Sequence, residues 1–82
     1  MREIIRALYV QLNAPDWAAP NLDALADVLR DLSWLPEGPV LVTVPDLSAL
    51  DAGARARLLD TLRRSAADAA GSARPVRLVG AH

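Results

Sequence analysis

The chain has 82 residues, of which 52% are hydrophobic and 23% are charged, and its formal net charge is −1. This length and composition predict a single folded domain over residues 1–82 and exclude intrinsic disorder. The small net charge argues against direct nucleic-acid binding, because such proteins usually carry a basic surplus that neutralises phosphates. Cysteine is absent and no apolar run approaches the roughly 20 residues of a membrane span, so disulfides, thiolate metal sites and a membrane partner are excluded. We therefore expect a cytoplasmic protein.

The N-terminal half predicts two short helices separated by a loop. From Arg2 to Leu12 the apolar residues recur at three- and four-residue spacing, which is typical of a helix with one buried face. Residues 13–20 contain two prolines and Trp17, so the first helix ends before them. Asn21 can then cap a second helix at about Asn21 to Leu32, because its side chain can accept from the free amides of the first turn.

The C-terminal half predicts a strand, a helix and a second strand. The two strands are the short apolar runs from Val40 to Val44 and from Pro75 to Val79. Asp51 can cap the helix between them, and Gly71 can end it. Strands joined through a helix of this length pair in parallel. The positions expected to face inward on this helix are Leu58, Leu59, Leu62, Ala66 and Ala69.

A brief helical turn is expected just before this helix. Asp46 follows the first strand and can cap a turn that runs through Leu50.

Catalytic and metal-binding patterns are weak in this chain. The only histidine, His82, is the last residue, which is a poor position for a general base. The serines lie at helix ends or in loops without a nucleophile motif, and the isolated glycines form no phosphate-binding loop. The aspartates lack the spacing of a calcium loop. We expect no catalytic residue, cofactor or metal ion.

The second helix carries an acidic stripe formed by Asp23, Asp27 and Asp31, which are spaced four residues apart and share one helix face. On charge pattern alone, a solvated polar face with Arg30 as a partial counter-ion is preferred over a partner-binding face. Trp17 is similarly open to two interpretations. It is either a core anchor or an exposed aromatic residue that inserts into a partner.

Residues 17–27 read Trp-Ala-Ala-Pro-Asn-Leu-Asp-Ala-Leu-Ala-Asp and resemble the signature of the barstar family, the inhibitors of barnase-type ribonucleases. The order of the expected helices and strands extends this resemblance loosely over nearly the whole chain. It implies a barstar-like α/β fold in which a small parallel β-sheet, with two strands visible here, packs against about three main helices. It also implies that the carboxylates of Asp23 and Asp27 occupy the positions of RNA phosphates in the enzyme's cleft. Trp17 would lie against the enzyme, and Asn21 would cap the inhibitory helix.

The resemblance departs from the family pattern at the beginning of the chain. The family begins with a β-strand, whereas here the first helix begins almost at Met1. A sheet of two strands leaves a strand edge uncovered, and such an edge invites pairing with a second copy of the chain. A homodimer through the exposed strand edge is therefore one expected form of the protein.

Three functional hypotheses follow from these patterns. The first is an intracellular inhibitor of a secreted or toxin-type ribonuclease. The second is a non-enzymatic regulatory or scaffolding module on a barstar-like framework, which Arg55 and Arg57 favour because they reduce the acidic surface. The third is an enzyme with Asp23 and Asp27 as paired carboxylates, which would need a cleft that so small a chain could barely enclose.

Overall fold

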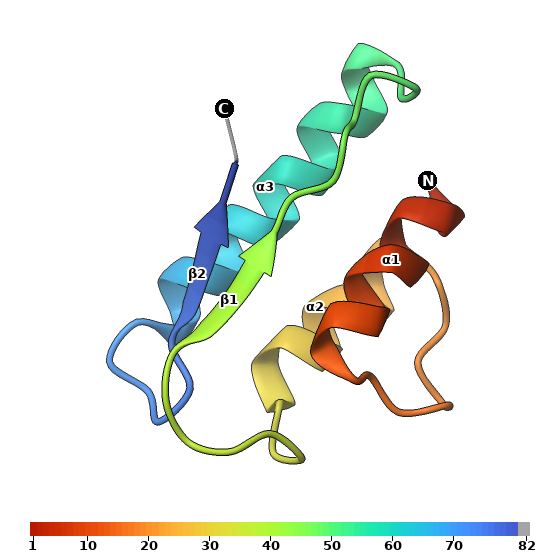
Figure 1. Ribbon diagram of the computed structural model, residues 1–82. Coiled ribbons are helices and arrows are strands. Elements are labelled where there is room, and N and C mark those ends of the chain that lie inside the picture. Colours follow the sequence, from red (N-terminus) through yellow and green to blue (C-terminus); the bar gives the residue numbers. More distant parts are fainter. Residues whose placement is uncertain (81–82) are drawn as a thin grey trace.

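The structure is a computed structural model that describes residues 1–80, so His82 lies outside the described residues. Within them, the elements follow one another in the order helix, helix, strand, helix, strand (Figure 1). They are α1 (Arg2–Leu12), α2 (Leu22–Asp31), β1 (Val40–Thr43), α3 (Ala52–Ala69) and β2 (Val76–Val79). This order and the α/β class agree with the sequence-based prediction.

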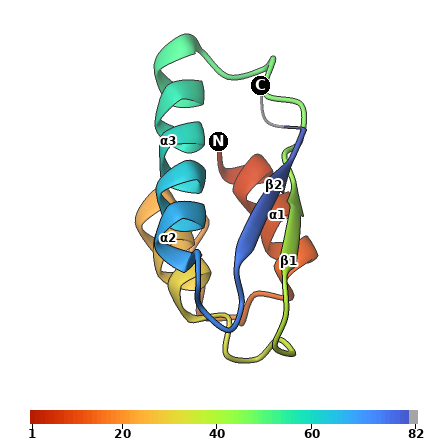
Figure 2. The same ribbon diagram turned by 90° about the vertical axis from the view of Figure 1, so that its left-hand side faces the viewer.

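The two strands form a parallel sheet in which Val40 lies opposite Val76. Helix α3 connects them and packs against both β2 and α2. Figure 2 shows α3 on one side of the molecule and the two strands on the other. Side chains alternate along the strands, so Val42 is buried on the helix side of the sheet whereas Leu41 and Val79 are exposed on its outer side.

One hydrophobic core joins the helices and the sheet. Its buried members are Ile5, Leu8, Leu12, Leu25, Val28, Leu29, Leu32, Val42, Leu50, Leu58, Leu62 and Val76. The expectation that Leu59 faces inward was wrong, because Leu59 is only half-buried and lies outside this cluster. One residue past Leu58 the helix has turned by about 100°, whereas Ser65 returns to the face of Leu58 and Leu62 and is buried.

Side-chain caps fix the beginnings of the two helices that were expected to have them. The Oδ1 atom of Asn21 accepts from the backbone N–H of Ala24 at 2.8 Å, at the start of α2. The Oδ1 atom of Asp51 accepts from the N–H of Ala54 at 2.7 Å, at the start of α3. Gly71 follows the end of α3 with a φ of 82°, a left-handed conformation that glycine adopts without a steric cost.

The segment between β1 and α3 is a turn, and the helical turn expected there is absent from the described structure. The backbone N–H of Leu50 donates to the carbonyl of Leu47 at 3.0 Å, which closes one tight turn. Asp46 accepts from the N–H of Ser48 at 2.9 Å, and this hydrogen bond, aided by the Ser48 hydroxyl, lowers the pKa of Asp46. The aspartate therefore stabilises the turn rather than a helix.

A side chain from α1 covers part of the free edge of β1. Gln11 donates from Nε2 to the carbonyl of Thr43 at 2.8 Å and accepts at Oε1 from the N–H of Thr43 at 2.9 Å. The backbone of the next residue, Val44, faces the other strand, because its N–H donates to the carbonyl of Val79 in β2. Gln11 thus satisfies the donor and the acceptor that a further strand would pair at Thr43. The expectation of an uncovered strand edge was therefore wrong for this part of β1.

We predict that Gln11→Ala lowers the free energy of unfolding by about 1 kcal/mol, because it leaves the backbone of Thr43 to water. Urea denaturation followed by circular dichroism measures this change. The matched control is Val10→Ala, which alters the neighbouring exposed position of α1 and should change stability by less than about 0.5 kcal/mol. Equal effects of the two substitutions would contradict the role given to Gln11.

Candidate protein-binding site

The acidic stripe lies on the exposed side of α2. Asp23, Asp27 and Asp31 are all exposed, whereas Leu25 and Leu29 are buried on the opposite side of the helix. The helical period of 3.6 residues separates the two sets. Because the apolar side of α2 packs against the core, the three carboxylates face the solvent.

The middle carboxylate of the stripe already has a partner within α2. Arg30 forms an ion pair with Asp27, and their side chains remain 65% and 59% exposed. The expected counter-ion role of Arg30 is confirmed for Asp27. Because exposed pairs of this kind contribute at most about 1 kcal/mol, a cation from outside can replace Arg30 at little cost.

Trp17 is exposed in the loop that precedes α2. Its exposed fraction is 63%, so the interpretation of Trp17 as a core anchor was wrong. Trp34 has a packing role instead, because it is half-buried against the core and its Nε1 donates to the carbonyl of Leu12 at 2.9 Å. No periodic pattern in the sequence singled out Trp34.

Tyr9 ties the loop that carries Trp17 to α1. Its hydroxyl donates to the carbonyl of Ala19 at 2.7 Å. Burial raises the pKa of Tyr9, and the nearby carboxylate of Asp27 raises it further. Tyr9 is one of the apolar residues that the spacing within the first helix singled out, yet its hydroxyl also holds the loop that leads into α2.

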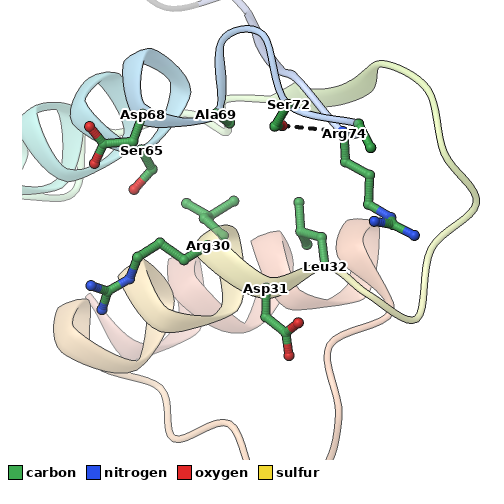
Figure 3. Close-up of a pocket in the computed structure, with 10 residues that line it drawn as sticks. Arg30, Asp31, Leu32, Ser65, Asp68, Ala69, Ser72 and Arg74 are labelled. Carbon is green, nitrogen blue, oxygen red and sulfur yellow. Dashed lines mark hydrogen bonds between the residues drawn. The ribbon is translucent and has the colours of Figure 1, made fainter.

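Two shallow hollows lie between α2 and α3, beside the acidic stripe. The first, of about 230 Å³, is lined by Leu29, Arg30, Asp31, Leu32, Ser65, Asp68, Ala69, Ser72, Ala73 and Arg74 (Figure 3). The second, of about 260 Å³, is lined by Leu22, Asp23, Ala26, Arg30, Thr61, Arg64, Ser65 and Asp68. In Figure 3 the side chain of Asp31 points away from the first hollow, and that of Arg30 extends along α2.

This arrangement gives no support to a carboxylate-based active site. Asp23 lines the second hollow, whereas Asp27 lines neither of the two and is paired with Arg30. Among residues 1–80, no group of three or more histidine, cysteine, aspartate or glutamate side chains is placed to hold a metal ion. The geometry of the described surface instead offers exposed charges and one exposed aromatic ring, which are groups suited to a protein contact.

Comparison with models of known protein families identifies the family of the chain. A model of the family described as Barstar (barnase inhibitor) matches residues 1–80. The chain belongs to the barstar family. No curated protein and no solved structure matches it. Within the described part of this barstar-family chain, no helix is long and apolar enough to cross a membrane.

We predict that Tyr9 titrates above the ordinary tyrosine pKa of about 10. Tyr9 is the only tyrosine in the sequence, so the rise of tyrosinate absorbance at alkaline pH follows this one group. A raised pKa means that the fold favours the neutral phenol. Its stabilising effect is therefore complete below about pH 10 and is lost as the pH rises through the higher pKa of the folded state.

The variant Asp27→Asn tests the physical cause of this pKa shift. It removes the negative charge, so the titration midpoint of Tyr9 should fall while staying above 10, because burial is the larger cause. A wild-type midpoint at or below 10 would contradict the placement of Tyr9.

Proposed function

We propose that this protein inhibits a barnase-like ribonuclease by placing the acidic face of α2 in the basic cleft that binds RNA. One observation carries the proposal: within a chain of the barstar family, exposed Asp23 and Asp27 lie on one helix face and exposed Trp17 precedes them in the adjoining loop. The target is a secreted or toxin-type ribonuclease. The inhibitor acts in the cytoplasm, where it protects the cell that makes the enzyme.

The physical chemistry of a phosphate-binding cleft supports this mechanism. Such a cleft is concave and positively charged, so carboxylates entering it form charge-assisted hydrogen bonds with the cations that otherwise hold phosphates. The same charges steer the two proteins together and raise the association rate. Asp23 and Asp27 serve both effects, and Asn21 holds the first turn of α2 through its bond to Ala24.

Trp17 supplies the apolar part of the proposed contact. An exposed tryptophan offers a large rigid surface, and tryptophan is frequent among the residues that dominate binding energy. Tyr9 limits the movement of the loop through its bond to Ala19, which lowers the entropy lost on binding.

In this proposal the protein acts by occluding the RNA-binding cleft of the ribonuclease, and it uses no catalytic residue of its own.

A second candidate function is that of a non-enzymatic regulatory or scaffolding module. The pairing of Arg30 with Asp27 favours that candidate, because an exposed carboxylate with an internal partner needs no external one.

We predict that Asp27→Ala weakens inhibition at least 30-fold, which corresponds to about 2 kcal/mol or more for a central contact residue. Its free energy of unfolding should change by less than about 0.5 kcal/mol, because the side chain is exposed. The measurement is inhibition of a panel of small bacterial ribonucleases by the purified chain, with urea denaturation in parallel. Glu37→Ala removes another exposed carboxylate, outside α2, and serves as the control.

The two candidates give different results in this experiment. Loss of inhibition in Asp27→Ala alone supports the inhibitor. Comparable losses of inhibition and of stability would reject Asp27 as a contact residue. Absence of inhibition by the wild-type chain across the whole panel would favour the scaffolding module.

We also propose that a homodimer forms through the outer edge of β2. The carbonyls of Pro75 and Val79 accept from β1, so the alternate backbone groups at Val76 and Leu78 turn toward the outer edge. Gln11 covers Thr43 on the opposite edge of the sheet, which leaves β2 as the better edge for a second copy.

We predict that this dimer is weak, because strands of four residues form few hydrogen bonds across the edge. Size-exclusion chromatography with light scattering should show a molar mass that rises from monomer toward dimer as protein concentration increases. A monomeric mass at every concentration would contradict pairing through β2.

A further inference from the structure

Two arginines flank the carboxylates of α2. Arg30 and Arg64 line the same hollow between α2 and α3, together with Asp23. Both are well exposed, and each pairs with a carboxylate of its own helix: Arg30 with Asp27, and Arg64 with Asp60 at 3.1 Å. Because exposed pairs of this kind are weak, both guanidinium groups can exchange these carboxylates for one from a partner.

Arg30 and Arg64 would lower the affinity for a partner surface that carries only positive charges. With Asp68, which also lines the hollow, and Asp60, the partner of Arg64, five aspartates and two arginines leave this face with a net charge of −3, so the two arginines are its minority charge. Each arginine would meet like charges in a purely cationic cleft, and like charges across an interface lower affinity. A carboxylate from the partner would reverse the sign of that contact, since a guanidinium binds a carboxylate through two parallel hydrogen bonds.

We infer that the partner of α2 carries an aspartate or glutamate side chain that docks in the hollow between α2 and α3, where Arg30 and Arg64 bind it. The inference rests on the proposed function and adds to it the chemistry of the target, a ribonuclease with an acidic residue beside its basic cleft. The hollow, of about 260 Å³, is open and large enough for such a side chain.

The other polar groups of the hollow suit the same mixed-charge contact. Thr61 and Ser65 also line it, so hydroxyl groups lie near the proposed position of the carboxylate. Asp68 and Asp23 line it as well, and cations of the partner beside its carboxylate can pair with them. Alternating charges of this kind select one partner over others, because a shifted arrangement brings like charges together.

The sign of one mutational effect tests the inference. If Arg30 merely masks Asp27, Arg30→Ala frees the carboxylate and tightens binding to a basic cleft. If Arg30 and Arg64 bind a partner carboxylate, Arg30→Ala and Arg64→Ala each weaken binding, and we expect about a tenfold increase in the dissociation constant for each. The control is Arg77→Ala, which removes an exposed arginine of β2 that lines neither hollow and should leave affinity unchanged.

The binding experiment uses a ribonuclease that the full wild-type chain inhibits, with Asp27→Ala measured beside the arginine variants. Weaker binding of Arg30→Ala and Arg64→Ala, coupled in double-mutant cycles to neutralisation of one acidic residue of the enzyme, supports the inference. Unchanged or tighter binding of both variants, with binding lost in Asp27→Ala, overturns the inference and leaves the proposed function intact. If no ribonuclease is inhibited by the wild-type chain, the proposed function and the inference fail together.

Discussion

The burial of Leu25 and Leu29 against the core sets the direction of every charged side chain on α2. A helix of ten residues is marginal in water by itself, so α2 depends on this contact for its existence as well as its orientation. The carboxylates of Asp23 and Asp27 are consequently held on a packed element rather than on a loop. A binding face that is ordered before the partner arrives loses less conformational entropy on association.

Helix α1 connects the thin sheet to the proposed binding face through two polar side chains. Gln11 holds the edge of β1 at Thr43, and Tyr9 holds the loop before α2 at Ala19. Parallel sheets are usually covered on both faces, whereas here Leu41 on the outer face is exposed. At the edge of the sheet, the two hydrogen bonds from Gln11 of α1 to Thr43 supply part of the constraint that a third strand would otherwise provide.

Local patterns predicted most of the fold because each element has a clear period and a clear cap. Asn21 and Asp51 cap α2 and α3 as expected, and the two β-branched runs pair in parallel. In α3 the sequence pattern wrongly assigned Leu59, one position past Leu58, to the buried face. Contacts between distant positions escaped prediction, since no local pattern tells that Gln11 will meet a strand 32 residues further along the chain.

The candidate site was predictable in its charges but not in its aromatic residues. The four-residue spacing placed Asp23 and Asp27 on one face, and both are exposed. Trp17 and Trp34 lie outside the helices, where no periodicity distinguishes a buried ring from an exposed one.

The exposed ion pair between Arg30 and Asp27 also determines how binding responds to ionic strength. Ion pairs formed inside the partner's cleft are more buried than the pair between Arg30 and Asp27, so dissolved ions screen them less. Steering acts over distances beyond the screening length of about 8 Å in physiological salt, where screening is strong. Added salt should therefore slow the encounter of the two proteins more than it shortens the life of their complex.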